Sequence, residues 1–234
     1  MKNQKISIII PFFNEQHELK EVIKIIKKQE KINKKLIYEY IFINDYSSDN
    51  SLKVINNEKK KLINYISKKI KIYTNKKNIG FARTVMKGFG LAKSTYVLFV
   101  SGDGEVDISE ITNQINFNYD LCIFQRKSMQ SRPASRIIIS KIYKRLISFI
   151  FKIKKIDFNG VSIIKKNKIK KLNLTSNSFF FNAEIIIKST KNKLNISYNN
   201  YFNLRKKNMY KSTSLNFKQF FYVFLDLIKT KCAS

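Results

Sequence analysis

Three acidic residues at alternate positions are the clearest candidates for chemistry in this sequence. Asp103, Glu105 and Asp107 follow the apolar run 96–100. On an extended backbone, side chains at alternate positions point to the same side, so this spacing predicts three carboxylates on one face. Hard divalent cations such as Mg²⁺ or Mn²⁺ prefer oxygen ligands, and a cation held there would neutralise a bound diphosphate.

A solvated acidic turn is the alternative explanation for this segment, and it is the usual one for an isolated Asp-x-Glu pattern. Acid is scarce in this chain, because its 234 residues contain only 16 Asp and Glu against 46 Lys and Arg. A cluster of three acids in the segment 103–107 is therefore poorly explained by chance, which favours a metal site.

Alternating apolar runs and amphipathic patterns predict the scaffold that must hold these carboxylates. The expected order is strand 6–10, a helix after Asn14, strand 38–43, helix 51–67, strand 69–74, helix 80–93 and strand 96–100. This β-α-β-α-β-α-β order predicts a mostly parallel sheet flanked by helices. The length suits one such α/β domain.

Polar residues gather where the predicted strands end. Asn14 and Glu15 follow the first strand, Asp45 and Asp49 follow the second, and the acidic segment 103–107 follows the fourth. Because ligands bind at the carboxyl ends of the strands in such sheets, we expect these residues to meet at one rim.

Two basic amphipathic segments occupy the second half of the chain. A short strand at 120–125 precedes a long helix predicted at 133–155, and an aromatic-rich helix is predicted at 215–228. Helices of this kind lie on lipid headgroups with their apolar faces buried. Packing of the first helix on the protein core, with solvated lysines, is an equally good explanation.

The formal charge of +30 is the most unusual property of the composition. Most of the basic residues are Lys, spread along the whole chain together with abundant Asn and Ile, which indicates a general compositional bias. A positive surface would still favour anionic lipids and phosphorylated substrates. A basic nucleic-acid-binding protein is the alternative of another class, but that function leaves the acidic rim unexplained.

Other classes of site are poorly supported. Cys122 and Cys232 provide neither a metal-binding spacing nor a disulfide framework, and the single histidine, His17, makes a Ser/His/Asp triad hard to build. The sequence shows no signal peptide and no apolar run of transmembrane length. We therefore expect a cytoplasmic protein whose contact with the inner face of the cell membrane is peripheral.

Four motifs in the first half are similar to those of the family 2 glycosyltransferases, which have the GT-A fold. The segment 8–15 (Ile-Ile-Ile-Pro-Phe-Phe-Asn-Glu) resembles the start of that family, and 44–49 (Asn-Asp-Tyr-Ser-Ser-Asp) resembles its Asp-Asp-Gly-Ser-x-Asp loop. The segment 78–80 resembles its Asn-x-Gly helix start, and 101–105 lies where the family carries its Asp-x-Asp motif. Each motif alone is weak, but the four occur in the family's order.

The second half resembles the branch that includes dolichol-phosphate mannose synthase and related polyprenyl-phosphate glycosyltransferases. Matching features are Arg126, the Arg136/Ser140 pair, the loop 157–160, the Phe-rich stretch 179–184, and the segment 205–211 with Arg205, Asn208, Tyr210 and Lys211. The resemblance therefore covers most of the chain, with a glycosyltransferase domain at 1–210 and a C-terminal amphipathic helix at 211–234. Within the domain, 1–110 would be the nucleotide-sugar half and 111–210 the acceptor half.

The resemblance also implies roles for particular residues. It implies a UDP- or GDP-linked sugar in a pocket lined by Pro11, Asn14, Glu15, Asp45 and Asp49. It implies Mg²⁺ or Mn²⁺ on Asp103 and Glu105, with Asp107 at an assisting position. It implies that phosphate oxygens are gathered by Arg126, Arg136, Arg205 and Lys211, a task that suits cationic side chains.

The acceptor decides the mechanism. A polyprenyl phosphate is already anionic and can attack the anomeric carbon without a general base, with inversion. A glycan hydroxyl, as in cell-surface polysaccharide assembly, would need a carboxylate base, and Glu184 is the candidate; an acid near a helix N-terminus is the structural alternative for this residue. A sugar nucleotidyltransferase would need a Gly-rich loop, where this chain has the segment 11–14 (Pro-Phe-Phe-Asn).

The chain departs from the family pattern at several positions. Tyr46 replaces a loop glycine, so the turn must avoid the left-handed conformation or accept strain. Glu105 is one methylene longer than the usual aspartate, and Asn208 replaces a glycine in the segment expected to close over the donor. These changes bear on the identity of donor and acceptor more than on the class of enzyme.

Overall fold

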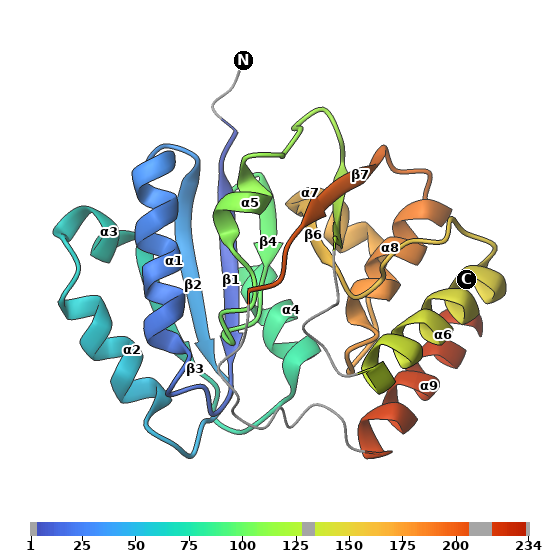
Figure 1. The fold of residues 1–234 in the computed structure, drawn as a ribbon, viewed down its shortest axis with the longest axis horizontal. Coiled ribbons are helices and arrows are strands. Elements are labelled where there is room, and N and C mark those ends of the chain that lie inside the picture. Colours follow the sequence, from blue (N-terminus) through green and yellow to red (C-terminus); the bar gives the residue numbers. More distant parts are fainter. Residues whose placement is uncertain (1–3, 128–133, 206–216, 233–234) are drawn as a thin grey trace.

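The computed structural model describes residues 4–127, 134–205 and 217–232 as an α/β fold around one sheet (Figure 1). The strands are β1 (Ile6–Phe12), β2 (Ile37–Asn44), β3 (Ile70–Thr74), β4 (Tyr96–Phe99), β5 (Leu121–Arg126), β6 (Val161–Lys165) and β7 (Ile196–Phe202). Their order in the sheet is β3-β2-β1-β4-β6-β5-β7. Only β6 runs antiparallel to its neighbours among these strands, so the predicted mostly parallel sheet is confirmed.

Helices flank the sheet, as predicted for this fold class. They are α1 (Leu19–Ile32), α2 (Ser51–Lys60), α3 (Asn64–Lys69), α4 (Phe81–Leu91), α5 (Ile108–Thr112), α6 (Ala134–Phe151), α7 (Lys166–Ile169), the 3-10 helix η1 (Lys170–Leu172), α8 (Phe181–Lys191) and α9 (Phe217–Cys232). The long basic helix and the C-terminal aromatic helix of the sequence interpretation correspond to α6 and α9.

The prediction of one helix over 51–67 is wrong. Ile63 has an extended conformation (φ −56°, ψ 146°), which divides this segment into α2 and α3. Ile55, Leu62 and Ile66 are buried on both sides of the break. The spacing of these residues is also compatible with one continuous helix. The apolar pattern therefore gave no indication of the break between α2 and α3.

The second half contains strands that the sequence interpretation missed. β6 inserts between β4 and β5, and β7 forms the edge of the sheet beside β5. β6 is a short buried strand between a loop and α7, and the apolar residues of β7 are interrupted by Ser197, Asn199 and Asn200. Neither strand therefore has the long apolar run that identified β1 and β4. The sheet is therefore wider than predicted.

Helices cover both faces of the sheet. Because side chains alternate along each strand, one strand contributes residues to the core on both faces. In β1, Ile6, Ile8 and Ile10 join a core cluster with α1, α2 and α3, whereas Ile9 joins a second cluster with α4, α6 and α8. Every residue of β1 is buried. β1 is thus the central strand on which the rest of the fold packs.

The C-terminal helix belongs to the same packed unit. Leu227 of α9 is part of the second core cluster, and Lys231 Nζ donates to the carbonyl of Ile150 in α6 at 3.1 Å. The predicted boundary between 210 and 211 lies outside the described residues. Within the described ranges, no helix combines the length and the apolar character that crossing a membrane requires.

Two glycines in α4 provide a test of this packing. A Cβ on Gly88 would lie 2.4 Å from Cγ2 of the buried Ile9, whereas a Cβ on Gly90 would meet nothing within 4 Å. We expect Gly88→Ala to lower the free energy of unfolding by about 1–3 kcal/mol because the site is overpacked. Gly90→Ala should raise it by about 0.5–1 kcal/mol, because alanine favours a helix interior.

Urea unfolding of both variants and the wild type checks this expectation. The two substitutions add the same methyl group to the same helix, so Gly90→Ala is the control for intrinsic helix propensity. Equal stabilities of the two variants would contradict the close packing of α4 on β1.

Candidate active site

The candidate site is built around the carboxyl end of β1. The carbonyl of Phe12 accepts the N–H of Asp45 at 2.9 Å, which holds the loop after β2. On the other side, the carbonyl of Pro11 accepts the N–H of Gly102 at 3.0 Å, which holds the loop after β4. The predicted meeting of these loops at one rim is therefore observed. Pro11 lies at the centre of that rim.

Asn14 connects the loop after β1 to the loop after β2. Its φ of 55° is left-handed, which asparagine tolerates better than most residues. Its N–H donates to Ser47 Oγ at 3.0 Å, and its Oδ1 accepts the N–H of Ser48 at 2.9 Å. The side chain of Asn14 thus fixes the conformation of the rim.

Glu15 and Asp49 continue the same contact. The N–H of Glu15 donates to Ser51 Oγ at 2.8 Å. Asp49 accepts the N–H of Gln16 at 3.2 Å and that of Ser51 at 2.9 Å, the second at the start of α2. The carboxylate of Asp49 therefore joins the loop after β1 to the first residue of α2.

Asp45 is buried and uses both carboxylate oxygens within the protein. Oδ1 accepts from Asn75 Nδ2 and from the N–H of Ile79, both at 2.9 Å, and Oδ2 accepts the N–H of Gly80 at 2.8 Å. These bonds hold the loop that leads into α4. In this arrangement, Asp45 positions the backbone beside the pocket predicted for the nucleotide.

Tyr46 adopts the strained, left-handed conformation, which was one of the two possibilities left open by the sequence. Its φ is 63°, and its side chain is exposed. A left-handed conformation costs a residue with a Cβ roughly 1–2 kcal/mol. Asn44 Oδ1 supports the turn by accepting the N–H of Ser47 at 2.9 Å.

The acidic segment does not have the extended backbone that the spacing argument assumed. Residues 102–103 form a turn, Gly104 has a φ of 70°, and Asp103 Oδ1 accepts the N–H of Glu105 at 3.1 Å. A Cβ on Gly102 would lie 2.7 Å from that of Phe12, so the turn presses closely on β1. The prediction that three carboxylates share one face is therefore wrong.

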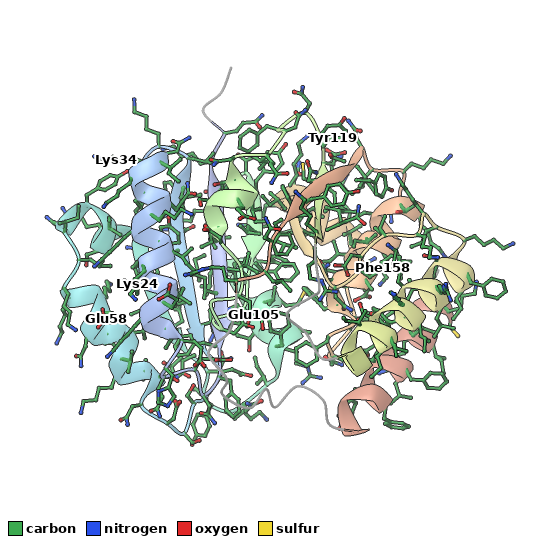
Figure 2. All side chains as sticks on the ribbon, viewed as in Figure 1. Lys24, Lys34, Glu58, Glu105, Tyr119 and Phe158 are labelled. Atoms are coloured by element: carbon green, nitrogen blue, oxygen red, sulfur yellow. The ribbon has the colours of Figure 1, made fainter. Side chains whose placement is uncertain are left out.

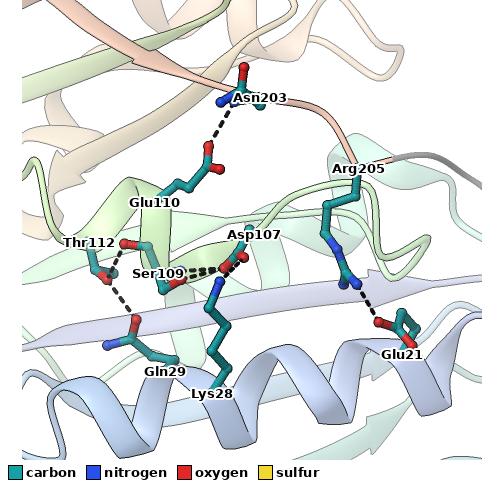
Figure 3. Close-up of polar contacts among 9 residues, drawn as sticks. All are labelled: Glu21, Lys28, Gln29, Asp107, Ser109, Glu110, Thr112, Asn203 and Arg205. Carbon is teal, nitrogen blue, oxygen red and sulfur yellow. Dashed lines mark hydrogen bonds and ion pairs between the residues drawn. The ribbon is translucent and has the colours of Figure 1, made fainter. Parts of the chain in front are cut away.

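Asp107 serves a different purpose (Figure 3). It is the N-cap of α5, where it accepts the N–H of Ser109 at 3.0 Å, and it pairs with Lys28 Nζ of α1 at 2.7 Å. Burial by itself would raise the pKa of Asp107, yet Lys28 and Ser109 hold it below its ordinary value. These contacts give Asp107 a structural role that the sequence interpretation did not assign.

Asp103 and Glu105 remain as a pair of carboxylates on the rim. Figure 2 shows Glu105 near the middle of the molecule, between the half that holds α1–α3 and the half that holds α6, α8 and α9. In the part of the chain that the structure describes, no group of three His, Cys, Asp or Glu is placed to hold a metal ion. Mg²⁺ is commonly held by one or two carboxylates together with substrate phosphates, so two carboxylates would be enough for such an ion.

Arg205 lies beside this pair. Its N–H donates to the carbonyl of Glu105 at 2.9 Å, and its guanidinium pairs with Glu21 at the start of α1 (Figure 3). Pairing with Arg205, and then with Lys24, lowers the pKa of Glu21. The Arg205 and Glu21 side chains are 36% and 37% exposed, so this pair is accessible to a competing anion.

Arg126 is in a very different environment. Its Nε and Nη2 donate to the two oxygens of Asp157 at 2.6 and 2.7 Å, and only 5% of the arginine side chain is exposed. Nη2 also donates to Ser140 Oγ of α6 at 3.4 Å. Burial by itself would raise the pKa of Asp157, but the Arg126 guanidinium holds it below its ordinary value. Arg126 thus ties β5 to α6 and to the loop before β6.

The other two predicted cations are Arg136 and Lys211. The backbone of Arg136 is in the first turns of α6, but its side chain is outside the described residues, as is all of Lys211. Asn208 and Tyr210, which belong to the same motif, are outside them too. Their predicted roles stay predictions.

Glu184 is fully buried in α8 and does not reach the rim. Its carboxylate accepts the N–H groups of Thr175 and Ser176, each at 2.9 Å, and pairs with Lys188 at 2.7 Å. Burial by itself would raise its pKa, but Lys188 and these N–H groups hold the pKa below the ordinary value. A general base must reach the substrate's proton, so this arrangement speaks against that role for Glu184.

Some residues of the rim escaped the sequence interpretation. Asn75 directly follows β3, is buried, and links Asp45 to Lys87, whose Nζ donates to Asn75 Oδ1 at 2.7 Å. Its place just after a predicted strand was a usable signal. Lys28 gave none, because 79 positions separate it from its partner Asp107.

Sequence comparisons agree with this architecture. Residues 7–173 match the family described as Glycosyl transferase family 2. An undecaprenyl-phosphate 4-deoxy-4-formamido-L-arabinose transferase from Proteus mirabilis is 28% identical over 151 residues, 61% of this chain and 44% of that protein. A cholesterol galactosyltransferase from Borreliella burgdorferi is 29% identical over 224 residues, 85% of this chain and 59% of that protein. The chain thus spans about half the length of these relatives.

Solved structures share the fold at low sequence identity. Glucosyl-3-phosphoglycerate synthase from Mycobacterium tuberculosis, in complex with Mn²⁺, UDP and phosphoglyceric acid, has a TM-score of 0.66 and 10% identity; 98% of this chain and 78% of that chain are covered. A mannosyltransferase from Pyrobaculum calidifontis in complex with GDP-Man and Mn²⁺ has a TM-score of 0.58 and 10% identity, with 84% and 55% covered. This likeness concerns the fold.

Replacing Glu184 tests whether it is a structural anchor. We expect Glu184→Gln to lower the free energy of unfolding by about 3 kcal/mol, because it leaves the buried Lys188 without its anion. Glu58→Gln is the matched control, since Glu58 pairs with the exposed Lys61 at 2.8 Å and should cost less than about 1 kcal/mol. Urea unfolding at neutral pH measures both effects.

The pH dependence gives a second measurement on the same variants. The folded-state pKa of Glu184 is depressed, so its contribution to stability is complete above the ordinary value of 4.5 and is lost as the pH falls through the folded-state pKa. The stability difference between wild type and Glu184→Gln should therefore shrink in acid. The anchoring role would be contradicted if wild type and Glu184→Gln differed little in their free energy of unfolding at neutral pH and this difference stayed the same in acid.

Proposed function

The chain belongs to glycosyl transferase family 2 and has a GT-A-type fold, and on this premise we propose that it transfers a sugar from a nucleotide-sugar donor to a polyprenyl phosphate. The observation that carries the proposal is the rim at the end of β1, where the loops after β2 and β4 are bonded to Phe12 and Pro11. The reaction would take place on the cytoplasmic face of the cell membrane and invert the anomeric carbon.

The donor would lie over this rim. Asn14, Glu15 and Asp49 fix the loops beside the base and ribose, and Asp45 fixes the backbone of Ile79–Gly80 at the start of α4. Solved relatives of the same fold are complexes with UDP or with GDP-Man, each with Mn²⁺. A UDP- or GDP-linked sugar is accordingly the proposed donor.

Asp103 and Glu105 would hold Mg²⁺ or Mn²⁺. Such a cation would neutralise charge on the donor diphosphate and on the departing nucleoside diphosphate. Gly102 and Gly104 keep the turn that carries the two carboxylates close to β1 and α1. The turn therefore fixes these ligands relative to the donor loops, which are bonded to the same strand.

The arginines divide between phosphate contact and positioning. The half-exposed Arg205–Glu21 pair is worth little in water, so Arg205 can exchange its partner for a phosphate at small cost. Breaking the buried Arg126–Asp157 pair would be costly, so we assign Arg126 the role of holding α6 and the acceptor side in place. Arg136 and Lys211 would complete the set of phosphate-binding cations.

A phosphate acceptor also suits the structure because it needs no general base. The one candidate base for a hydroxyl acceptor, Glu184, is buried among its own partners. The relative from Proteus mirabilis is named for an undecaprenyl-phosphate substrate. A lipid hydroxyl is the second candidate, because the cholesterol galactosyltransferase matches 85% of this chain.

Transfer assays decide between these acceptors. The protein would be incubated with labelled UDP- and GDP-sugars and Mn²⁺, together with polyprenyl phosphate, cholesterol or a glycan in separate reactions. We expect labelled product only with polyprenyl phosphate, and thermal stabilisation by the accepted donor only when Mn²⁺ is present. Failure to transfer to any acceptor and to bind any nucleotide would overturn the proposal.

The carboxylates on the rim can be tested one by one. We expect Asp103→Asn to reduce Mn²⁺-dependent transfer by at least about 100-fold, because it removes a charged ligand of the cation. Asp107→Asn should keep transfer within about tenfold of wild type, since it mainly loses the cap of α5 and the ion pair with Lys28, which costs stability. Equal losses of activity in both folded variants would show that Asp107 is part of the metal site.

A further inference from the structure

Helix α6 is apolar on two opposite sides. On the inner side, Ile147 and Phe151 are buried in the core. On the outer side, Ile138, Ile142 and Phe149 are exposed, and Phe149 exposes 85% of its surface. A helix needs only one apolar stripe to pack on its own domain, so the outer stripe is unexplained by the fold.

Helix α9 extends this surface. Phe221, Phe224 and Ile228 recur at helical spacing and are exposed, whereas Leu227 faces the core. α6 and α9 lie side by side at the right of Figure 1, and Lys231 of α9 bonds to the backbone of α6. We call the exposed side chains of the two helices the α6–α9 face: Ile138, Ile139, Ile142, Leu146, Phe149, Phe221, Tyr222, Phe224 and Ile228.

The charges around this face have one sign. Lys141 and Arg145 are exposed on α6, and Lys229 and Lys231 are exposed on α9. The sequence of α6 contains no acidic residue, and the single acid of α9, Asp226, is buried. The α6–α9 face is therefore an apolar strip bordered by cations.

We propose that the α6–α9 face docks on the surface of an anionic lipid bilayer. Interfacial helices bury apolar side chains at the headgroup boundary while Lys and Arg contact anionic headgroups, which is the pattern seen here. A second copy of the chain would bring two sets of cations together, and nucleic acid would leave the apolar strip exposed. The inference deepens the proposed function, because a polyprenyl-phosphate acceptor resides in a bilayer.

Hydrogen bonds connect the α6–α9 face to the candidate active site. Asp226 of α9 accepts the N–H groups of Asn177 and Ser178, each at 2.9 Å. The side chain of Asn177 in turn accepts from Arg83 Nε of α4 at 2.7 Å, close to Gly80 on the rim. A bilayer bound to α9 would therefore lie at a fixed position relative to the donor loops.

Vesicle co-sedimentation of the full chain tests the proposal. Vesicles of phosphatidylcholine alone would be compared with vesicles of equal parts phosphatidylcholine and phosphatidylglycerol, without donor or acceptor. We expect binding to the anionic vesicles, weakened by salt, and a loss of about tenfold or more in Ile142→Glu/Phe149→Glu. Ile63→Glu is the control variant, because Ile63 is 68% exposed and lies outside this face. This variant should bind vesicles like the wild type.

A charge variant and a soluble substrate separate the possible results. Lys141→Glu/Arg145→Glu should lose the preference for phosphatidylglycerol, which distinguishes headgroup attraction from apolar insertion alone. Transfer to a short-chain, water-soluble polyprenyl phosphate without vesicles should be unchanged in all these variants. If the wild type does not transfer sugar to this soluble acceptor, the result counts against the proposed function. The vesicle-binding result would still test the docking of the α6–α9 face.

Two outcomes would overturn the proposal. One is vesicle binding by folded Ile142→Glu/Phe149→Glu that equals that of wild type. The other is a wild-type dimer in analytical ultracentrifugation that the same variant dissociates, since the face would then bind a second copy. Circular dichroism confirms that the variants are folded, which we expect because the substituted side chains are exposed.

Discussion

The site depends on how β1 is enclosed. β1 is buried along its whole length between β2 and β4, and its last carbonyl groups hold Asp45 on one side and Gly102 on the other. The loops after β2 and β4 are therefore fixed to one strand end. This constraint explains why Gly102 is needed, because any Cβ there would meet Phe12, and why strain at Tyr46 can be tolerated within a turn that is bonded on both sides.

Exposure decides which ion pairs can take part in ligand binding. Arg205 and Glu21 form an accessible pair beside Glu105, whereas Arg126–Asp157 and Glu184–Lys188 are enclosed. An enclosed pair has already lost its hydration, so separating the partners leaves an uncompensated charge. Arginine is thus accessible from solvent at the rim, at Arg205, and forms an internal connection beneath it, at Arg126.

The sequence allowed the first half of the fold to be predicted well, because β1, β2 and β4 are rich in apolar residues and polar residues mark their ends. The break at Ile63, and the strands β6 and β7, had no comparable signal in apolar periodicity. At the site, Asn14 and Asp103 were predicted to lie on one rim and do so. Their hydrogen-bond partners depend on pairings between distant segments, which spacing along the chain does not reveal.

Acidic residues are scarce in this chain, but their scarcity alone does not mark a metal site. In a chain with 16 acidic and 46 basic residues, a rare carboxylate is equally valuable as an internal anchor, and Asp45, Glu184 and Asp226 each accept two backbone N–H groups. Asp107 belongs with these anchors. Its position three residues before Glu110 at the start of an apolar segment is the pattern of a helix N-terminus. Local capping patterns therefore have to be considered before neighbouring carboxylates are counted as one metal site.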